Sequence, residues 1–162
     1  DIVRLATYAP LLGHAEAWQW SPDLIWFNNL EVLKTANYYV QKMYSENRGN
    51  EVLEMTLEGK AVTGQEGLYA TAARDSRTGE TIIKIVNASD ARKNVRIGID
   101  GLKKRQGITS CRRIYMQSDD LNVMNTFGNE TATPQEEQVE ASGKALDLSL
   151  EPYSFSIYRL TL

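Results

Sequence analysis

The fold is decided by residues 68–89, which read LYATAARDSRTGETIIKIVNAS. Two runs rich in strand-forming residues, LYATAARD and ETIIKIVNAS, flank SRTG, a short turn with Gly79 near its end. Strand-like runs on either side of a glycine-containing turn are typical of a β-hairpin. The sequence therefore predicts an antiparallel hairpin across these residues.

The region after this hairpin continues the same pattern. Residues 94–100, NVRIGID, alternate strictly, which places Val95, Ile97 and Ile99 on one face of a strand that is half-buried. Further strands are predicted at residues 51–59, 108–118, 144–150 and 153–162. Six or more short strands at this spacing predict an antiparallel β-sandwich or barrel.

Residues 119–143 lack any periodicity and are polar, with several turn-forming residues. Long connections of this kind are either functional or simply mobile. Because the segment shows no recognisable arrangement of chemical groups, we interpret it as a surface connection.

Residues 1–50 have a different character. Apolar positions from Ile2 to Leu12 follow a helical period that ends at Gly13, which predicts a first helix. The apolar run LIWF, residues 24–27, predicts a strand buried on both faces, as in a parallel sheet. Thr35 is a suitable N-cap for a second helix over residues 36–47. Helix, strand and helix are typical of a βα repeat, so we place a domain boundary between residues 50 and 51.

Composition excludes several classes of function. Hydrophobic residues make up 42% and charged residues 24%, which is ordinary for a globular protein. A net charge of -3 with scattered bases argues against a nucleic-acid partner. No apolar run reaches the roughly 20 residues of a membrane-spanning helix. Cys111 is the single cysteine, so neither an intrachain disulfide nor a zinc-type metal site is expected.

Aromatic residues are concentrated in WQWSPDLIWF, residues 18–27. Trp18, Trp20 and Trp26 suggest sugar binding, since flat aromatic rings stack on the apolar faces of sugars. Core packing is the competing explanation; it is favoured for Trp26 and left open for Trp20. Glu16 and Asp23 are the only carboxylates near these rings, and we favour structural roles for both. His14 is alone and is also interpreted as structural.

Three blocks in this half carry a resemblance to a known family: TYAPLL at residues 7–12, HAEAWQWSPDLIWFNN at 14–29 and TANYYVQKMYSENRGN at 35–50. In order and spacing they resemble the end of the catalytic barrel of family 51 glycoside hydrolases, the α-L-arabinofuranosidases. The sequence departs from that pattern at Asn28 and at Thr35-Ala36. Residues 84–89, KIVNAS, and 151–160, EPYSFSIYRL, more loosely resemble the C-terminal sandwich of the family.

The resemblance implies a mainly β chain: a jelly-roll-like antiparallel sandwich over residues 51–162, preceded by a helix-strand-helix remnant of a (β/α)8 barrel over residues 1–50. It implies a parent enzyme that removes terminal α-L-arabinofuranosyl residues from arabinose-containing polysaccharides or oligosaccharides with retention. Such hydrolysis needs two carboxyl groups about 5 to 5.5 Å apart. By the resemblance, both catalytic glutamates precede Asp1, so no residue of this chain is catalytic and no cofactor is expected.

The resemblance also suggests substrate contacts for Gln19, Trp20 and Asp23 in the complete enzyme. This depends on where the preceding strand ends, because active sites of barrels lie at the carboxyl ends of their strands. If LIWF is the whole strand, these residues lie at the wrong end; if a strand starts near His14, they form the loop at the active face. The sequence leaves both arrangements open.

Two further expectations concern the chain by itself. A barrel remnant without its barrel has unpaired strand edges and apolar faces. We therefore expect residues 1–50 either to associate between chains, giving a homo-oligomer, or to collapse onto the sandwich. A stand-alone carbohydrate-binding or structural module is the alternative function, although the predicted sandwich contains no tryptophan. The compartment is not indicated; a secreted or periplasmic parent enzyme would fit the resemblance.

Overall fold

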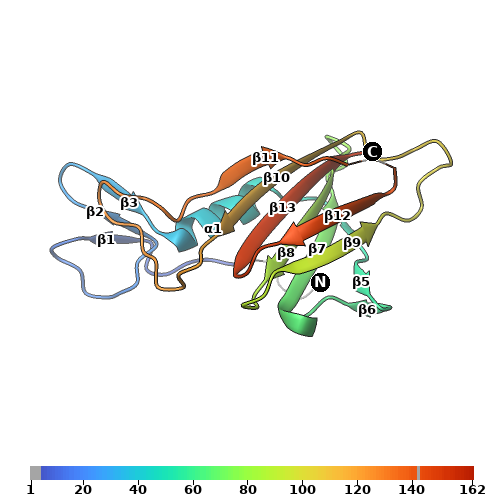
Figure 1. Ribbon diagram of the computed structural model, residues 1–162. Helices are drawn as coiled ribbons and strands as arrows, with labels where there is room; N and C mark the ends of the chain where they lie inside the picture. Colours follow the sequence, from blue (N-terminus) through green and yellow to red (C-terminus); the bar gives the residue numbers. More distant parts are fainter. Residues whose placement is uncertain (1–4, 142) are drawn as a thin grey trace. The chain divides into compact units, whose positions relative to one another are not determined.

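The structure is a computed structural model that describes residues 5–141 and 143–162. The chain divides into two compact units, each described here by itself (Figure 1). The first unit contains residues 1–42 and 122–133, and the second contains residues 43–121 and 134–162. Residues 122–133 therefore belong to the first unit, although the residues on either side of them in sequence belong to the second unit.

The predicted hairpin is confirmed and lies within the main sheet of the second unit. Strands β7 (Leu68–Arg74) and β8 (Thr81–Asn87) pair in antiparallel fashion, with Leu68 opposite Asn87. They belong to a six-stranded sheet in the order β11-β10-β13-β8-β7-β4. The other members are β4 (Glu51–Leu53), β10 (Ser110–Gln117), β11 (Gln135–Gln138) and β13 (Ser154–Thr161), and every pairing is antiparallel.

A smaller sheet forms the second layer of the sandwich. Strands β9 (Lys93–Gly98) and β12 (Ala145–Leu150) pair in antiparallel fashion and lie across the larger sheet (Figure 1). The alternation predicted for residues 94–100 is confirmed, because Val95 and Ile97 are half-buried whereas Asn94 and Arg96 are exposed. A short hairpin of β5 (Thr56–Leu57) and β6 (Lys60–Ala61) follows β4.

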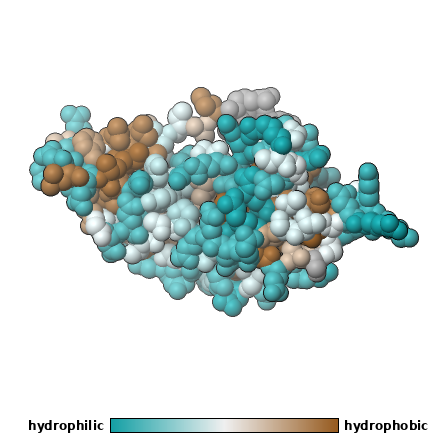
Figure 2. Space-filling model, turned by 90° about the horizontal axis from the view of Figure 1, so that it is seen from above, coloured by the Kyte–Doolittle hydropathy of each residue, from teal (hydrophilic) through white to brown (hydrophobic). Residues whose placement is uncertain are grey.

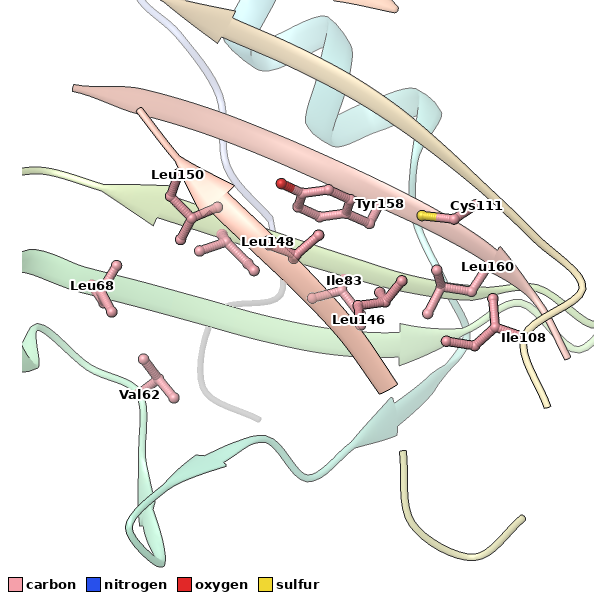
Figure 3. Packing of buried hydrophobic residues seen from close by; sticks show 11 residues of the cluster. Val62, Leu68, Ile83, Ile108, Cys111, Leu146, Leu148, Leu150, Tyr158 and Leu160 are labelled. Carbon is pink, nitrogen blue, oxygen red and sulfur yellow. The ribbon is translucent and has the colours of Figure 1, made fainter. Parts of the chain in front are cut away.

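The core fills the space between the two layers. Leu146, Leu148 and Leu150 of β12 point toward Ile83 of β8 and toward Tyr158 and Leu160 of β13 (Figure 3). Leu146 and Leu160 are fully buried, and Tyr158 is 1% exposed. Cys111 belongs to the same cluster, where burial raises the pKa of its thiol to about 11. The antiparallel sandwich predicted from the sequence is thus the fold of the second unit.

Part of the opposite face of the six-stranded sheet, around β13 and β8, is also buried. Ile157 is fully buried and Ile82 is 1% exposed. The end of α1 (Ala36–Glu46) contributes Met43, which is 2% exposed. It also contributes Tyr44, whose ring stacks on that of Phe155 with 4.9 Å between ring centres. The central strand β13 is therefore covered on both sides.

Strand β11 was not predicted, because it falls within residues 119–143. Its four side chains, Gln135 to Gln138, are all exposed, so the sequence shows no alternation. Backbone pairing with β10 holds it, supported by Arg113, which donates to the Glu137 carboxylate at 2.9 Å. The buried Arg113 guanidinium also donates to Ser156 Oγ and lies 4.0 Å from the centre of the Tyr115 ring. A strand at a sheet edge can thus form without a hydrophobic pattern.

The helix predicted from Ile2 to Leu12 is wrong over the described residues 5–12. They contain no helix: an irregular segment with a bend at residues 9–10 leads into β1 (Leu12–His14). The carbonyls of Pro10 and Leu11 accept hydrogen bonds from Leu24 and Ile25, so strand pairing uses the backbone groups that a helix would need. Pro10 also disfavours a helical conformation at the residue before it. Sequence periodicity alone could not show these tertiary partners.

The rest of the first unit follows the prediction in part: the strand at residues 24–27 forms, but it is not buried on both faces, because Ile25 and Trp26 are half-buried and Phe27 is exposed. Strand β2 (Ile25–Phe27) pairs in parallel with β1 and in antiparallel fashion with β3 (Val32–Lys34). The predicted helix is confirmed as α1, and Thr35 caps it by accepting a hydrogen bond from the Tyr38 amide at 3.2 Å. The division between the compact units falls within α1, after Lys42, whereas residue 50 stays our prediction for the end of the barrel portion. Within the part of the chain that the structure describes, no helix has the length and apolarity to cross a membrane.

Truncation of a core leucine tests the packing of the sandwich. We expect Leu146→Ala to lower the free energy of unfolding by about 2 to 5 kcal/mol, because it removes a fully buried side chain and leaves a cavity. The matched control is Leu121→Ala, since Leu121 is 66% exposed and its truncation should cost less than about 0.5 kcal/mol. Urea unfolding followed by circular dichroism measures both, and equal losses would contradict this description of the core.

Candidate functional site

The candidate site is the loop of residues 15–24, which connects β1 to β2. Because the two strands are parallel, the loop leaves the carboxyl end of β1 and returns to the start of β2. Three backbone hydrogen bonds fix its ends: Ala15 N to Phe27 O, Leu24 N to Pro10 O and Ile25 N to Leu11 O. A strand therefore precedes the loop, so its first residues follow the carboxyl end of β1, whereas Asp23 lies near the start of β2 and against Gly13 of β1.

The middle of the loop presents its side chains to solvent. Trp18 is 54% exposed, Trp20 is 65% exposed, and Gln19 between them is exposed as well. The ring of Trp18 packs edge-on against Trp26 of β2, with 6.1 Å between ring centres. One tryptophan thus anchors the loop to the sheet, while Trp20 and Gln19 remain accessible.

Asp23 lies in a different environment from the other two candidates. It is 3% exposed and closes the loop just before β2. Its carboxylate lies against Gly13, where an added Cβ would come within 2.5 Å of Oδ2 and 3.0 Å of the Trp26 ring. The structure therefore brings Gln19 and Trp20 together on the loop surface and places Asp23 beneath it, packed on β1.

The remaining polar residues of the loop fit structural roles. Glu16 is exposed, and its amide donates to His14 Nδ1 at 3.2 Å. The His14 ring packs edge-on against Phe27, with 5.2 Å between ring centres. Among the described residues, no group of three or more histidine, cysteine or acidic side chains could hold a metal ion.

A second group of residues, in the segment 122–133 beside the end of β3, was missed by the sequence interpretation. Glu130 accepts a hydrogen bond from the Lys34 amide at 3.1 Å and another from the Tyr39 hydroxyl. Asn125, which is 7% exposed, donates to the Lys34 carbonyl at 2.8 Å. No local pattern marks these two residues, because they act on backbone groups about 90 positions earlier.

The hydrogen bond between Tyr39 and Glu130 shifts the pKa of both side chains. Burial and the hydrogen bond to Glu130 raise the pKa of Tyr39 to about 12. The same hydrogen bond and the Lys34 amide lower the pKa of Glu130 below its ordinary value. At neutral pH the pair is therefore a neutral phenol that donates to a carboxylate.

The second unit contains a cavity of ≈ 480 Å³ that we do not assign to a sugar. Its lining is largely aliphatic and includes Leu53, Met55, Val62, Ile85, Val95 and Ile97. Polar residues also line it, but no aromatic ring does, so a sugar has no flat face on which to stack. The loop between β1 and β2 remains the better candidate.

The close approach of Gly13 to Asp23 can be tested by substitution. We expect Gly13→Ala to destabilise the first unit by about 1 to 3 kcal/mol, since the added methyl would overlap the Asp23 carboxylate. The matched control is Gly98→Ala, because an added Cβ there meets nothing within 4 Å. All 3 tryptophans of the chain, Trp18, Trp20 and Trp26, lie in the first unit, so their fluorescence during urea unfolding reports on it. Equal unfolding midpoints for the two variants would contradict the described contact.

The sequence of this chain is similar to those of known proteins. The family model described as "Alpha-L-arabinofuranosidase C-terminal domain" matches residues 1–154. The chain is 29% identical to alpha-L-arabinofuranosidase 1 of Arabidopsis thaliana, covering 99% of this chain and 24% of that protein. It is 29% identical to alpha-L-arabinofuranosidase A of Aspergillus niger, covering 97% of this chain and 23% of that protein. The chain thus spans about a quarter of the length of these curated relatives.

Solved structures give the same likeness. An arabinose-bound α-L-arabinofuranosidase, MgGH51, superposes with a TM-score of 0.78 and 25% identity, covering 96% of this chain and 24% of that one. The α-L-arabinofuranosidase of Thermotoga maritima superposes with a TM-score of 0.74 at 17% identity, covering 86% of this chain and 32% of that one. At that lower identity the second likeness concerns the fold alone.

Proposed function

The chain belongs to the α-L-arabinofuranosidase C-terminal domain family, and from this premise we propose that it is the C-terminal portion of a retaining α-L-arabinofuranosidase. The complete enzyme would remove terminal α-L-arabinofuranosyl residues from arabinose-containing polysaccharides or oligosaccharides. This portion would supply one loop of the substrate pocket and brace the end of the catalytic barrel.

The position of the loop 15–24 is the observation that carries the proposal. It leaves the carboxyl end of β1, the end of barrel strands at which substrates bind. Trp20 offers a flat apolar face on which the C–H groups of a sugar ring can stack. The Gln19 amide, beside it, can both donate to and accept from sugar hydroxyls.

Asp23 takes a supporting part in this proposal. Its buried carboxylate packs against Gly13 of β1, at the base of the loop. A carboxylate in this place can also face a hydroxyl of a sugar that enters the pocket of the complete enzyme. The structure therefore supports Gln19 and Trp20 as direct contacts more strongly than Asp23.

Bond cleavage is assigned to the part of the enzyme outside this chain. Retaining hydrolysis requires an acid/base carboxyl and a nucleophilic carboxylate about 5 to 5.5 Å apart. Near the loop, Glu16 is exposed while Asp23 is buried against Gly13. Such different surroundings do not form a pair that flanks one glycosidic bond, so we expect this chain alone to be inactive.

Activity assays with two proteins test the proposal. We expect this chain alone to release no 4-nitrophenol from 4-nitrophenyl α-L-arabinofuranoside, and the enzyme that includes the natural upstream sequence to release it. In that longer enzyme, Gln19→Ala and Trp20→Ala should each lower kcat/KM by about tenfold or more, since each removes a contact with bound sugar. Gln138→Ala, on the exposed edge strand β11, is the matched control and should leave kcat/KM unchanged.

The same assays separate the competing functions. Activity of this chain alone would contradict our conclusion that it contains no catalytic pair of carboxyl groups. Inactivity of both proteins, with binding of arabinan to this chain, would favour a stand-alone carbohydrate-binding module. That alternative draws on the exposed Trp18 and Trp20, but the sandwich itself presents no tryptophan.

The first unit also carries apolar surface that the rest of the enzyme would cover. Figure 2 shows apolar residues gathered over the part of the chain that contains β1, β2 and β3. Leu5 is 82% exposed, Leu30 is 93% exposed, and Leu11, Leu12 and Val32 are each more than half exposed. Exposed apolar surface of this kind marks an interaction site, and we assign it to the catalytic barrel of the complete enzyme.

Without the barrel, this surface should cause the chain to associate with itself. We expect light scattering to report a mass above the 18.2 kDa of one chain, falling toward the monomer for Leu5→Ser combined with Leu30→Ser. Leu121→Ser changes an exposed leucine of the second unit and should leave the mass unchanged. Monodisperse monomers of the unmodified chain would refute the assignment.

A further inference from the structure

We propose that Asn125 and Glu130 are positioning residues for the loop 15–24, and that the segment 122–133 is the device that holds this loop. Chain order places the segment between β10 and β11 of the sandwich, yet its contacts described below all lie within the first unit. The consequence for sugar binding rests on the proposed function, whereas the hold on the loop rests on the contacts alone.

The segment has an ordered shape of its own. Thr126 and Asn129 exchange backbone hydrogen bonds of 3.0 and 2.9 Å around a turn in which Gly128 has a φ of 74°. Asn125 then joins the two arms: its Oδ1 accepts from Ala132 N at 2.7 Å and its Nδ2 donates to Ala132 O at 3.1 Å. A side-chain amide thus takes the place of a strand pair, which explains how an aperiodic polar sequence is ordered.

The segment holds Lys34 by both of its backbone polar groups. The Lys34 amide donates to Glu130 Oε1 at 3.1 Å, and the Lys34 carbonyl accepts from Asn125 Nδ2 at 2.8 Å. Strand β3, which ends at Lys34, pairs with β2 and with no other strand in the described residues. Unpaired backbone groups are costly away from water. Two side chains of the segment therefore supply what a neighbouring strand would otherwise provide.

The residue that follows Lys34 transmits this hold to the loop. Thr35 donates to the Leu24 carbonyl twice, from its amide at 3.3 Å and from its hydroxyl at 2.7 Å. Leu24, which is 6% exposed, is the last residue of the loop, and its amide donates to Pro10 beside β1. Glu130 and Asn125 therefore fix Lys34, and through Thr35 they fix the end of the loop next to Asp23.

The Glu130 carboxylate also accepts a hydrogen bond from the Tyr39 hydroxyl, which restricts its orientation. The Tyr39 hydroxyl, on the first turn of α1, donates to the carboxylate oxygen that the Lys34 amide leaves free. The carboxylate thus spans the end of β3 and the start of α1. Because Thr35 also caps α1 through the Tyr38 amide, the loop end and the helix start share one anchor.

The competing explanation is that the segment only braces α1. In that case, loss of Asn125 or Glu130 would loosen the helix and lower stability, while the loop and the affinity for sugar would stay the same. A positioning role requires a different result: the loop itself should become more mobile, and KM should rise while kcat changes little.

The test uses the enzyme with its natural upstream sequence and four variants: Asn125→Ala, Glu130→Ala, Glu130→Gln and the control Glu136→Ala. Glu136 is an exposed carboxylate that pairs with Arg112 on the sandwich. We expect Asn125→Ala and Glu130→Ala to accelerate amide hydrogen exchange in residues 15–24 by about fivefold or more, as expected for loss of one hydrogen bond. Glu130→Gln should restore most of the protection, because its Oε1 still accepts from the Lys34 amide. The control should match the unmodified enzyme.

Kinetics provide the second measurement. For the same two alanine variants, KM toward 4-nitrophenyl α-L-arabinofuranoside should rise about fivefold while kcat stays within about twofold. Unchanged exchange in residues 15–24, or faster exchange confined to residues 36–46, would overturn the positioning role. Faster exchange of the loop in an enzyme that does not cleave the arabinofuranoside would confirm the hold on the loop and overturn the proposed function instead.

Discussion

Pairing of β13 on both of its edges is the interaction on which the sandwich depends. Eight residues of this strand, Ser154–Thr161, lie between β10 and β8, and its side chains are buried on both faces. Tyr158 and Leu160 enter the core beneath β12, whereas Phe155 and Ile157 lie on the other face with the end of α1. Because β13 follows the other five strands of the sheet in the sequence, the six-stranded sheet is completed only when β13 is added.

The same requirement, that backbone groups find partners, explains which elements the sequence could predict. The hairpin of β7 and β8 has local partners and a turn between them, so its residues alone indicate it. The capped helix α1 is equally local, with Thr35 placed three residues before the amide that it accepts from. Strand β11 and segment 122–133 instead find their partners far away in sequence. Nothing in QEEQ or in the polar residues around Asn125 reveals β10 or Lys34.

The misassigned helix at the N-terminus has the same cause. Apolar residues from Leu5 to Leu12 recur at helical spacing, yet the described part of this segment contains no helix and pairs through Pro10 and Leu11 with the start of β2. Leu5, Leu11 and Leu12 are each more than half exposed. The helical spacing therefore indicated neither the element nor the burial of these side chains.

The sequence could indicate which residues belong to the candidate site, but not the contacts that order it. Aromatic residues at Trp18 and Trp20 pointed to the loop, and the structure adds the strand β1 that sets its direction. What the sequence could not show is that Asn125 and Glu130, which lie between two strands of the sandwich in sequence, bind Lys34, which precedes the sandwich. A loop with three short strands beneath it has few backbone partners of its own. Asn125 and Glu130, in the segment between β10 and β11, supply partners for Lys34, so residues far apart in the sequence together order the first unit.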